Sequence, residues 1–250
     1  MDDLVGEGEP PGMAARELEE VAELHAISAD EPNTFAEAEK NPCWRKAMQE
    51  EMTSITENQT WSLEDMPLEH RAIGLKWVFK LKRNEKGEVV KHKARLVAKG
   101  YVHKQGVDFE EVFTPVARLE SVRFLLVIAA HYSWEVHHMD LKSAFLKGKL
   151  KETVYVRQPP GFLDNDNPNK VLRLHKALYG LRQAPRAWNA KLDSTLLSLK
   201  FKRCAFEHGI YTYGHGKKRL IVGVYVNDLI ITGGDVGVLG RFKKEMSKNF

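Results

Sequence analysis

Two carboxylates in this sequence stand where apolar strands are expected to end. Asp140 ends one such strand, and Asp228 follows Asn227 between two β-branched runs, Leu220–Val226 and Leu229–Ile231. The end of a buried strand holds a carboxylate rigidly, which suits a metal ligand. Two such acids on neighbouring strands would hold Mg²⁺, which binds through one or two carboxylates together with substrate phosphates. Taken alone, each acid is more often a turn former.

Basic residues concentrate on a predicted β-hairpin, because residues 76–99 hold nine bases and two acids. Lys76–Arg83 and Val89–Lys99 both alternate apolar and polar residues, and Asn84–Gly87 between them is typical of a turn. One face of the second strand carries three bases: Lys91, Lys93 and Arg95. Side chains on one face of a strand stand about 6.6–7 Å apart, a spacing that suits contact with nucleic-acid phosphates. An ordinary solvated face is the alternative.

The other predicted elements mix without a regular βαβ alternation, which favours an α+β fold. Helices are predicted over Leu119–Tyr132 and Ala184–Leu199 and from Val236 onward. Strands are predicted over Trp134–Asp140, Val154–Val156, Gly209–Tyr213, Arg219–Val226 and Leu229–Thr232. The apolar face of the first helix is expected to consist of Leu119, Val122, Leu126 and Ala130.

The net charge of +4 conceals two unlike segments, since residues 1–40 carry a net −10 and residues 41–250 a net +14. Residues 1–30 are predicted to be an acidic, disordered leader. The longest apolar run has seven residues, whereas a membrane helix needs about 20. Two cysteines exclude a disulfide framework, and the acidic start is unlike a signal peptide. These features predict an intracellular protein that is not in a membrane, cytoplasmic with access to the nucleus.

A series of motifs runs through the chain in order. It comprises Lys76-Trp77-Val78-Phe79-Lys80, Lys93–Tyr101, Asp140–Leu146, Gln158-Pro159-Pro160-Gly161-Phe162, Leu178–Trp188 and Tyr225-Val226-Asn227-Asp228. In type, order and spacing these motifs resemble the reverse transcriptase of copia-type long-terminal-repeat retrotransposons, especially the plant versions. The resemblance extends over residues 31–250. It implies a right-hand polymerase with fingers and a palm built on an antiparallel sheet, with the thumb missing.

The resemblance also implies roles for particular residues. Asp140 and Asp228 match the metal-binding aspartates of the palm, which would hold two Mg²⁺ ions. Arg95 and Lys82 match residues of the fingers that grip the triphosphate of the incoming nucleotide. The remaining matches are Phe145, a gate against the ribose 2′-hydroxyl; Gln183, which touches nucleotide and template; and Lys80, Lys91 and Lys93, which contact nucleic acid. The implied partners are an RNA template, a DNA primer, dNTPs and other retroelement proteins.

Four lysines follow the first motif aspartate, and they are expected to form a solvated face that touches the template backbone: Lys142, Lys147, Lys149 and Lys151. His137 and His138 stand beside Asp140 and suggest a metal cluster. Because adjacent residues on a strand point to opposite faces, packing is the favoured interpretation of the two histidines.

Two departures from the family pattern affect the expected function, a substitution at Asn227 and a truncation that leaves out the thumb and is expected to weaken the grip on a duplex. Asn227 replaces an aspartate, which removes one negative charge from the metal site but keeps a residue that tolerates a left-handed turn. A loss of about 3–4 kcal/mol of transition-state stabilisation would slow catalysis about 10²–10³-fold. Lys200 replaces a glycine, so a helix C-cap is expected to be lost. Two functions stay open: an impaired RNA-directed DNA polymerase, or a non-catalytic remnant that binds nucleic acid.

Overall fold

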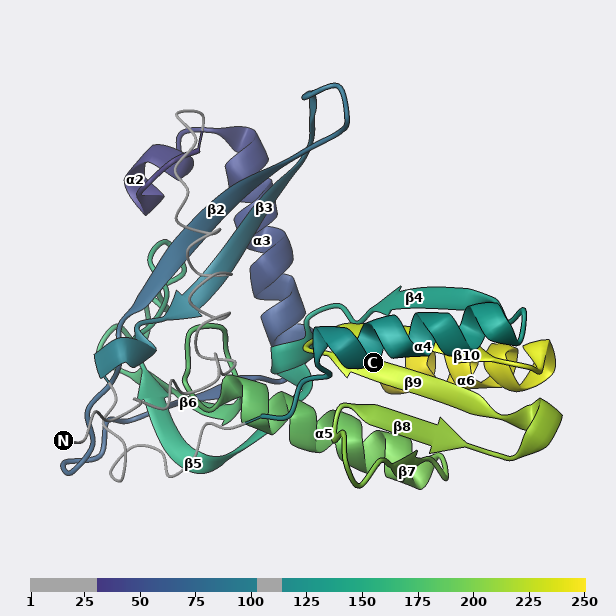
Figure 1. Ribbon diagram of the computed structural model, residues 1–250. Coiled ribbons are helices and arrows are strands. Elements are labelled where there is room, and N and C mark those ends of the chain that lie inside the picture. The colour runs from purple at the N-terminus through teal and green to yellow at the C-terminus, as the bar shows by residue number, and fades with distance from the viewer. Residues whose placement is uncertain (1–30, 103–113) are drawn as a thin grey trace, which may run out of the picture. The chain divides into compact units, whose positions relative to one another are not determined.

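The computed structural model describes residues 31–102 and 114–250 of the chain (Figure 1). The predicted acidic leader, residues 1–30, lies outside the described residues, so its disorder stays a prediction. The described part mixes helices with antiparallel sheets, which confirms the predicted α+β class. Among the described residues, no helix is both long and apolar enough to cross a membrane.

The chain divides into two compact units. The first, which we call the hairpin unit, comprises the described residues up to Glu51 together with Trp77–Leu96. The second, which we call the sheet unit, comprises Met52–Lys76 and the described residues from Val97 to Phe250.

The hairpin unit contains the predicted basic hairpin, formed by β2 (Leu75–Arg83) and β3 (Val89–Ala98), whose inner ends run into the sheet unit. The turn closes where it was predicted, because the Gly87 N–H donates to the Asn84 carbonyl at 2.9 Å and Gly87 has a φ of 81°. Two helices complete the unit, α2 (Phe35–Ala38) and the first part of α3 (Pro42–Glu57). The ring of Trp44 on α3 meets that of Phe79 edge-on at 5.2 Å, so α3 covers the apolar face of the hairpin.

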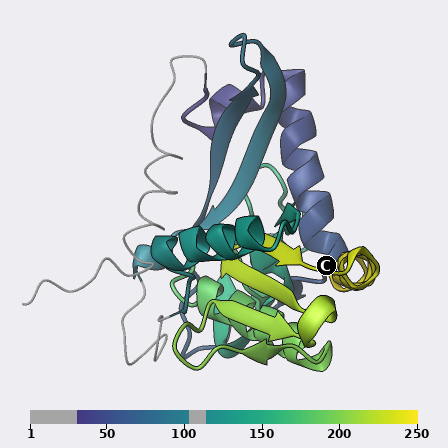
Figure 2. The same ribbon diagram turned by 45° about the vertical axis from the view of Figure 1, so that its right-hand side comes forward.

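The main feature of the sheet unit is a five-stranded antiparallel sheet with the strand order β4-β10-β9-β8-β7. Its strands are β4 (Val136–Asp140), β7 (Lys202–Arg203), β8 (Ile210–Tyr213), β9 (Leu220–Tyr225) and β10 (Asp228–Gly233). Helices α4 (Leu119–His131) and α6 (Val236–Asn249) lie on opposite faces of this sheet (Figures 1 and 2). Both faces are therefore covered at the central strand β9, where residues 220–224 are all buried. This explains why the strand is apolar throughout rather than alternating.

The predicted apolar face of α4 is wrong. The helix buries Leu125 and Ala129, whereas Leu119 and Leu126 are 58% and 43% exposed. The helix is apolar on nearly every side, so periodicity does not determine which side packs. Gly223 on β9 contributes to the choice, because a Cβ atom there would lie 3.4 Å from the Leu125 side chain. The missing side chain leaves room for Leu125 against the sheet.

A second antiparallel sheet in the same unit has the strand order β1-β6-β5. It consists of β1 (Trp61–Glu64), β6 (Val171–Lys176) and β5 (Lys149–Val156), of which only the last part of β5 was predicted. The loop between β5 and β6 is tied by Gln158, whose Nε2 donates to the carbonyls of Asn167 at 2.8 Å and Lys170 at 3.0 Å. The first residue of the Gln-Pro-Pro-Gly motif thus shapes the loop that it begins.

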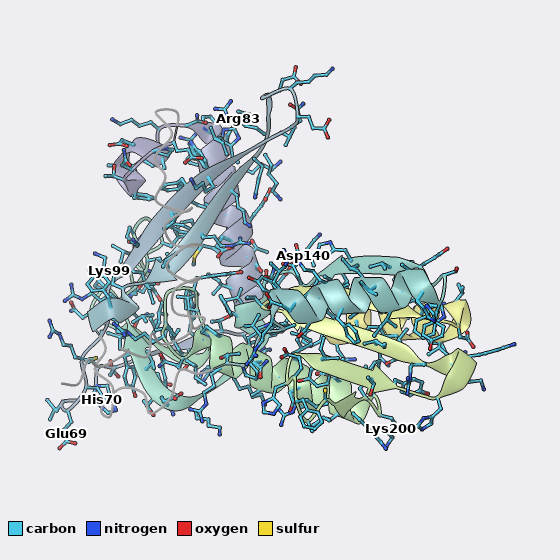
Figure 3. All side chains as sticks on the ribbon, viewed as in Figure 1. Glu69, His70, Arg83, Lys99, Asp140 and Lys200 are labelled. Carbon is cyan, nitrogen blue, oxygen red and sulfur yellow. The ribbon has the colours of Figure 1, made fainter. Side chains whose placement is uncertain are left out.

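The predicted helix over Ala184–Leu199 is confirmed as α5 (Ala184–Ser198), but the expected loss of its C-cap is wrong. Lys200 adopts a left-handed φ of 68°, its N–H donates to Leu197 O, and the N–H of Phe201 donates to Leu196 O. These are the two hydrogen bonds of a Schellman cap. The cap therefore forms with lysine in a backbone conformation that glycine adopts at lower cost (Figure 3 labels Lys200).

Replacing Lys200 with glycine is expected to raise the free energy of unfolding by about 0.5–1 kcal/mol, because relief of the left-handed strain exceeds the extra backbone entropy of glycine. Urea denaturation measures the change. Lys200→Ala is the control, since alanine keeps the Cβ atom and the strain. A glycine variant no more stable than the alanine variant would contradict the prediction.

Candidate active site

The two predicted metal-binding aspartates are brought together by the register of the five-stranded sheet. Asp140 is the last residue of β4 and Asp228 the first residue of β10, and they lie directly opposite each other (Figure 3 labels Asp140). Side chains at directly opposite positions have Cβ atoms about 4.5–5.5 Å apart and point to the same face. The side chain of Asp228 is 38% exposed and Asp140 is also exposed, so both carboxylates are accessible. The register therefore brings the two carboxylates together on one face of the sheet.

The turn between β9 and β10 consists of Val226 and Asn227, because Tyr225 already pairs with Asp228. Val226 has a φ of 53°, so the left-handed residue of this turn is the β-branched valine and not Asn227, the residue expected to tolerate that conformation. Two hydrogen bonds stabilise the left-handed backbone conformation of this turn. Trp188 on α5 donates its indole N–H to the Val226 carbonyl at 2.8 Å, and Asn227 O accepts from the N–H of Leu141 at 3.0 Å.

Asn227 contacts the first carboxylate directly. Its Nδ2 donates to Oδ1 of Asp140 at 2.7 Å. An aspartate at this position would supply no such donor when ionised and would add a negative charge instead. Compared with an aspartate, Asn227 thus lacks a negative charge and engages one oxygen of Asp140 in a hydrogen bond.

The second carboxylate is contacted by His138, whose Nε2 lies 2.6 Å from Oδ1 of Asp228. Packing was the favoured interpretation of both histidines, and for the exposed His138 this is wrong. Because strand side chains alternate, His138 shares its face with Asp140, two residues on, whereas His137 points away and receives a hydrogen bond from Lys243 at 3.0 Å. The i, i+2 spacing to Asp140 was the signal that could have identified His138.

Phe145 and Gln183 are buried in the same unit. Phe145 lies in the 3-10 helix η2 (Ala144–Lys147), and its ring meets that of Tyr179 edge-on at 5.0 Å. Gln183 directly precedes α5 and is 1% exposed, yet neither polar atom of its amide has a hydrogen-bond partner among the described residues. A buried amide without partners costs about 1–3 kcal/mol. This makes Gln183 a candidate for contact with a ligand that supplies the missing hydrogen bonds.

The other predicted site residues lie in the hairpin unit, and acidic side chains contact three of them. Arg95 Nη1 lies 2.8 Å from Glu51 Oε2, Lys80 lies 3.4 Å from Glu31, and Lys91 lies 3.8 Å from Glu50. Lys82 is exposed and Lys93 half-buried. The alternation on β3 agrees with the prediction, since Ala94, Leu96 and Ala98 on the opposite face are buried. The acidic partners were missed, and they make the basic face less cationic than its sequence suggests.

Glu51 is the most deeply placed of these acids, at 4% exposure. Burial raises the pKa of its carboxyl above the ordinary value, although the charge of Arg95 and a hydrogen bond from the Leu96 N–H act in the opposite direction. The folded state therefore binds this proton more tightly than the unfolded chain does. The resulting stabilisation is fully present below the unfolded-state pKa of about 4.3 and is lost as the pH rises through the raised folded-state pKa.

Replacing Glu51 with glutamine, which does not ionise, is expected to remove the loss of stability that ionisation of Glu51 causes as the pH rises. The free energy of unfolding of Glu51→Gln, relative to that of the natural chain, should therefore increase as the pH rises from about 4 to 7. Urea denaturation at several pH values measures the trend. Glu50→Gln, which alters an exposed carboxylate on the same helix, is the control. The same trend in both variants would contradict the role of burial at Glu51.

No group of three or more His, Cys, Asp or Glu residues with metal-binding geometry is found in the part of the chain that the structure describes. The pair Asp140 and Asp228 consists of oxygen donors on the same sheet face, which suits Mg²⁺ completed by substrate phosphates. Asn227 adds a neutral amide where a third carboxylate would be stronger. The donor set therefore fits a divalent cation, with reduced charge.

Comparison with known proteins places this geometry in context. Residues 58–250 match the family model described as reverse transcriptase (RNA-dependent DNA polymerase). The chain is 42% identical over 221 residues to a retrovirus-related Pol polyprotein from transposon RE1 of Arabidopsis thaliana, an alignment covering 88% of this chain and 15% of the relative. It is 41% identical over 230 residues to the corresponding polyprotein from transposon TNT 1-94 of Nicotiana tabacum, covering 90% and 17%. The Ty1-LR2 Gag-Pol polyprotein of Saccharomyces cerevisiae is 24% identical over 211 residues, covering 82% and 11%. The chain thus spans about 15% of the length of the first of these relatives.

Proposed function

Because the chain belongs to the reverse transcriptase (RNA-dependent DNA polymerase) family, as the reverse transcriptase domain of a copia-type retrotransposon Pol polyprotein, we propose that it retains template-directed nucleotidyl transfer in an impaired form. The observation that carries the proposal is the register that sets Asp140 opposite Asp228. The proposed substrates are an RNA template, a DNA primer and dNTPs. In this assignment the hairpin unit corresponds to polymerase fingers and the sheet unit to the palm.

Asp140 and Asp228 are the side chains that would hold Mg²⁺. When bound, the metal would stabilise the attacking and leaving oxygens as the primer 3′-hydroxyl displaces pyrophosphate from the dNTP. The protein positions the two carboxylates through a rigid sheet and through the turn that Trp188 supports at Val226. This positioning lowers the reorganisation needed during the reaction.

Residues outside the carboxylate pair are assigned to substrate binding. The unpartnered amide of Gln183 has both a donor and an acceptor to offer to nucleotide or template. The buried ring of Phe145 is held by Tyr179, which fits a rigid wall beside the ribose. On the hairpin, Arg95 carries a guanidinium, a group that recognises phosphates through paired N–H donors, and its Nη1 donates to Glu51. Lys82 with Arg95 would contact the triphosphate, and Lys80, Lys91 and Lys93 would contact nucleic-acid phosphates.

Primer extension tests the proposal. The purified chain is incubated with a labelled DNA primer on an RNA template, dNTPs and Mg²⁺, beside Asp140→Asn. Slow extension by the natural chain and none by the variant is the expected result. If the natural chain and Asp140→Asn give indistinguishable products, the proposal that this site catalyses extension is overturned.

The second candidate function is nucleic-acid binding without catalysis. It is favoured by the hydrogen bond from Asn227 to Asp140, which occupies an oxygen that the metal would use. Salt-dependent binding of the template–primer duplex without extension would support this alternative.

A further inference from the structure

Four lysines from four elements gather in the sheet unit. The β5–β6 register sets Lys149 directly opposite Lys176. Lys147 ends η2, one residue before Gly148. Figure 1 shows α5 beginning beside β5 and β6, and Lys191 lies on this helix. We call Lys147, Lys149, Lys176 and Lys191 the lysine cluster.

Close packing at Gly148 holds the cluster together. A Cβ atom at Gly148 would lie 2.6 Å from the backbone of Ala187 and Trp188, so the segment between Lys147 and Lys149 rests directly on α5. Lys191 follows Ala187 by four residues and therefore lies on the same side of the helix. The proximity of these lysines thus follows from backbone packing and strand register, and does not depend on flexible side chains alone.

The cluster has little negative charge to balance it. No ion pair with a carboxylate is found for any of the four lysines within residues 31–102 and 114–250, and three of them are half-buried. The Lys176 ammonium donates to the Asn58 carbonyl at 2.5 Å, and that of Lys191 lies 5.8 Å from the centre of the Phe250 ring. Burial lowers the pKa of Lys176, and the positive charges of Lys147, Lys149 and Lys191 lower it further.

Like charges held close together oppose folding unless a ligand of opposite charge is present. Four ammonium groups from four elements, η2, β5, β6 and α5, match a ligand with several neighbouring phosphates better than a single anion. A nucleic-acid strand supplies one phosphate about every 3.4 Å along its axis. We propose that the lysine cluster is a second phosphate-binding site, which takes the backbone of bound nucleic acid outside the catalytic centre.

The choice of nucleic acid as the polyanion rests on the proposed function. The cluster shares α5 with the active site, because Trp188, which bonds the turn at Val226, precedes Lys191 by three residues on this helix. Nucleic acid held by the cluster is thereby held on the unit that carries the two aspartates. In a chain with weakened metal binding, this site supplies affinity that does not depend on the metal.

Binding of a labelled RNA–DNA duplex, measured by fluorescence anisotropy in EDTA at 50–200 mM salt, tests the proposal. The test variant is Lys147→Gln/Lys149→Gln/Lys191→Gln, which leaves Lys176 and its bond to Asn58 intact. The control removes three exposed lysines of the same unit: Lys217→Gln/Lys218→Gln/Lys244→Gln. We expect the test variant to bind at least about tenfold more weakly at 100 mM salt, with the salt slope reduced by about 2–3, and the control to change affinity by no more than about twofold.

Equal losses in the two variants, or no loss in the test variant, would overturn the proposal. Thermal unfolding checks that both variants fold, and the test variant should melt no lower than the natural chain because charge repulsion is relieved. If it melts lower, the double variant Lys149→Gln/Lys191→Gln replaces it in the same comparison. Tripolyphosphate is measured in the same way. If the test variant loses affinity for tripolyphosphate but not for the duplex, the site binds free polyphosphate, and nucleic acid is overturned as its ligand. Because the measurement needs neither Mg²⁺ nor dNTPs, its outcome is separate from that of primer extension.

Discussion

Replacing Asn227 with aspartate is expected to raise the rate of primer extension about 10²–10³-fold, which corresponds to about 3–4 kcal/mol of transition-state stabilisation. The structure supplies two reasons. The variant adds a third carboxylate beside Asp140 and Asp228, and it removes the amide donor that contacts Asp140 Oδ1 at 2.7 Å. The measurement is the single-turnover extension rate on an RNA template in saturating Mg²⁺.

The matched control is Asn227→Ala, which frees Asp140 from the hydrogen bond without adding charge. A small gain in this variant and a large gain in Asn227→Asp would assign the effect to the missing charge. Equal extension rates for Asn227→Asp and the natural chain would contradict the hypothesis that Asn227 impairs catalysis. A second measurement does not require catalysis: Mg²⁺ should raise the melting temperature of Asn227→Asp more than that of the natural chain, because the added carboxylate strengthens binding to the folded state.

Replacing Gly180 with alanine is expected to lower the free energy of unfolding by about 2–5 kcal/mol, the sum of left-handed strain and overpacking. Gly180 has a φ of +84°, and a Cβ atom there would collide with the carbonyl oxygen of Ala98 and approach Val97 Cγ1 to 2.6 Å. Ala98 also donates its N–H to Tyr179 O at 2.8 Å, so the two backbone segments cannot separate without breaking that bond. Urea denaturation measures the loss.

Gly216→Ala separates the two causes. Gly216 lies in the same unit with a φ of +55°, and a Cβ atom there would meet nothing within 4 Å. This control should cost only the left-handed strain, about 1–2 kcal/mol. Similar losses in both variants would show that the close approach of the segments at Ala98 and Gly180 contributes little.

The elements that were predicted correctly are those whose own residues specify them. The hairpin of β2 and β3 is specified by alternation on both strands and by the Asn84–Gly87 turn, and α5 is specified by the four-residue spacing of Trp188, Leu192 and Leu196, all of which are buried. The strands β1 and β6 were not predicted. They are short, and pairing with each other and with β5 defines them more than any local pattern does.

The contacts of individual side chains were predicted less well, because they depend on residues far apart in the chain. Glu51 meets Arg95 across 44 positions, and His138 meets Asp228 across 90. Neither spacing follows a local period, so no sequence pattern marks these partners. The side of α4 that packs was also wrong, since a helix that is apolar nearly all round takes its orientation from the surface it meets, here at Gly223.

The sequence by itself determined the family, the two aspartates and the substitution at Asn227, because these depend on residue type and order along the chain. Only the tertiary structure decided what each of these residues touches. Strand register set Asp228 opposite Asp140, packing left the amide of Gln183 buried without a partner, and the fit of Gly148 against α5 gathered four lysines. The physical reason is that charge, hydrogen bonding and burial act over a few ångströms in space, and separation along the chain does not determine that distance.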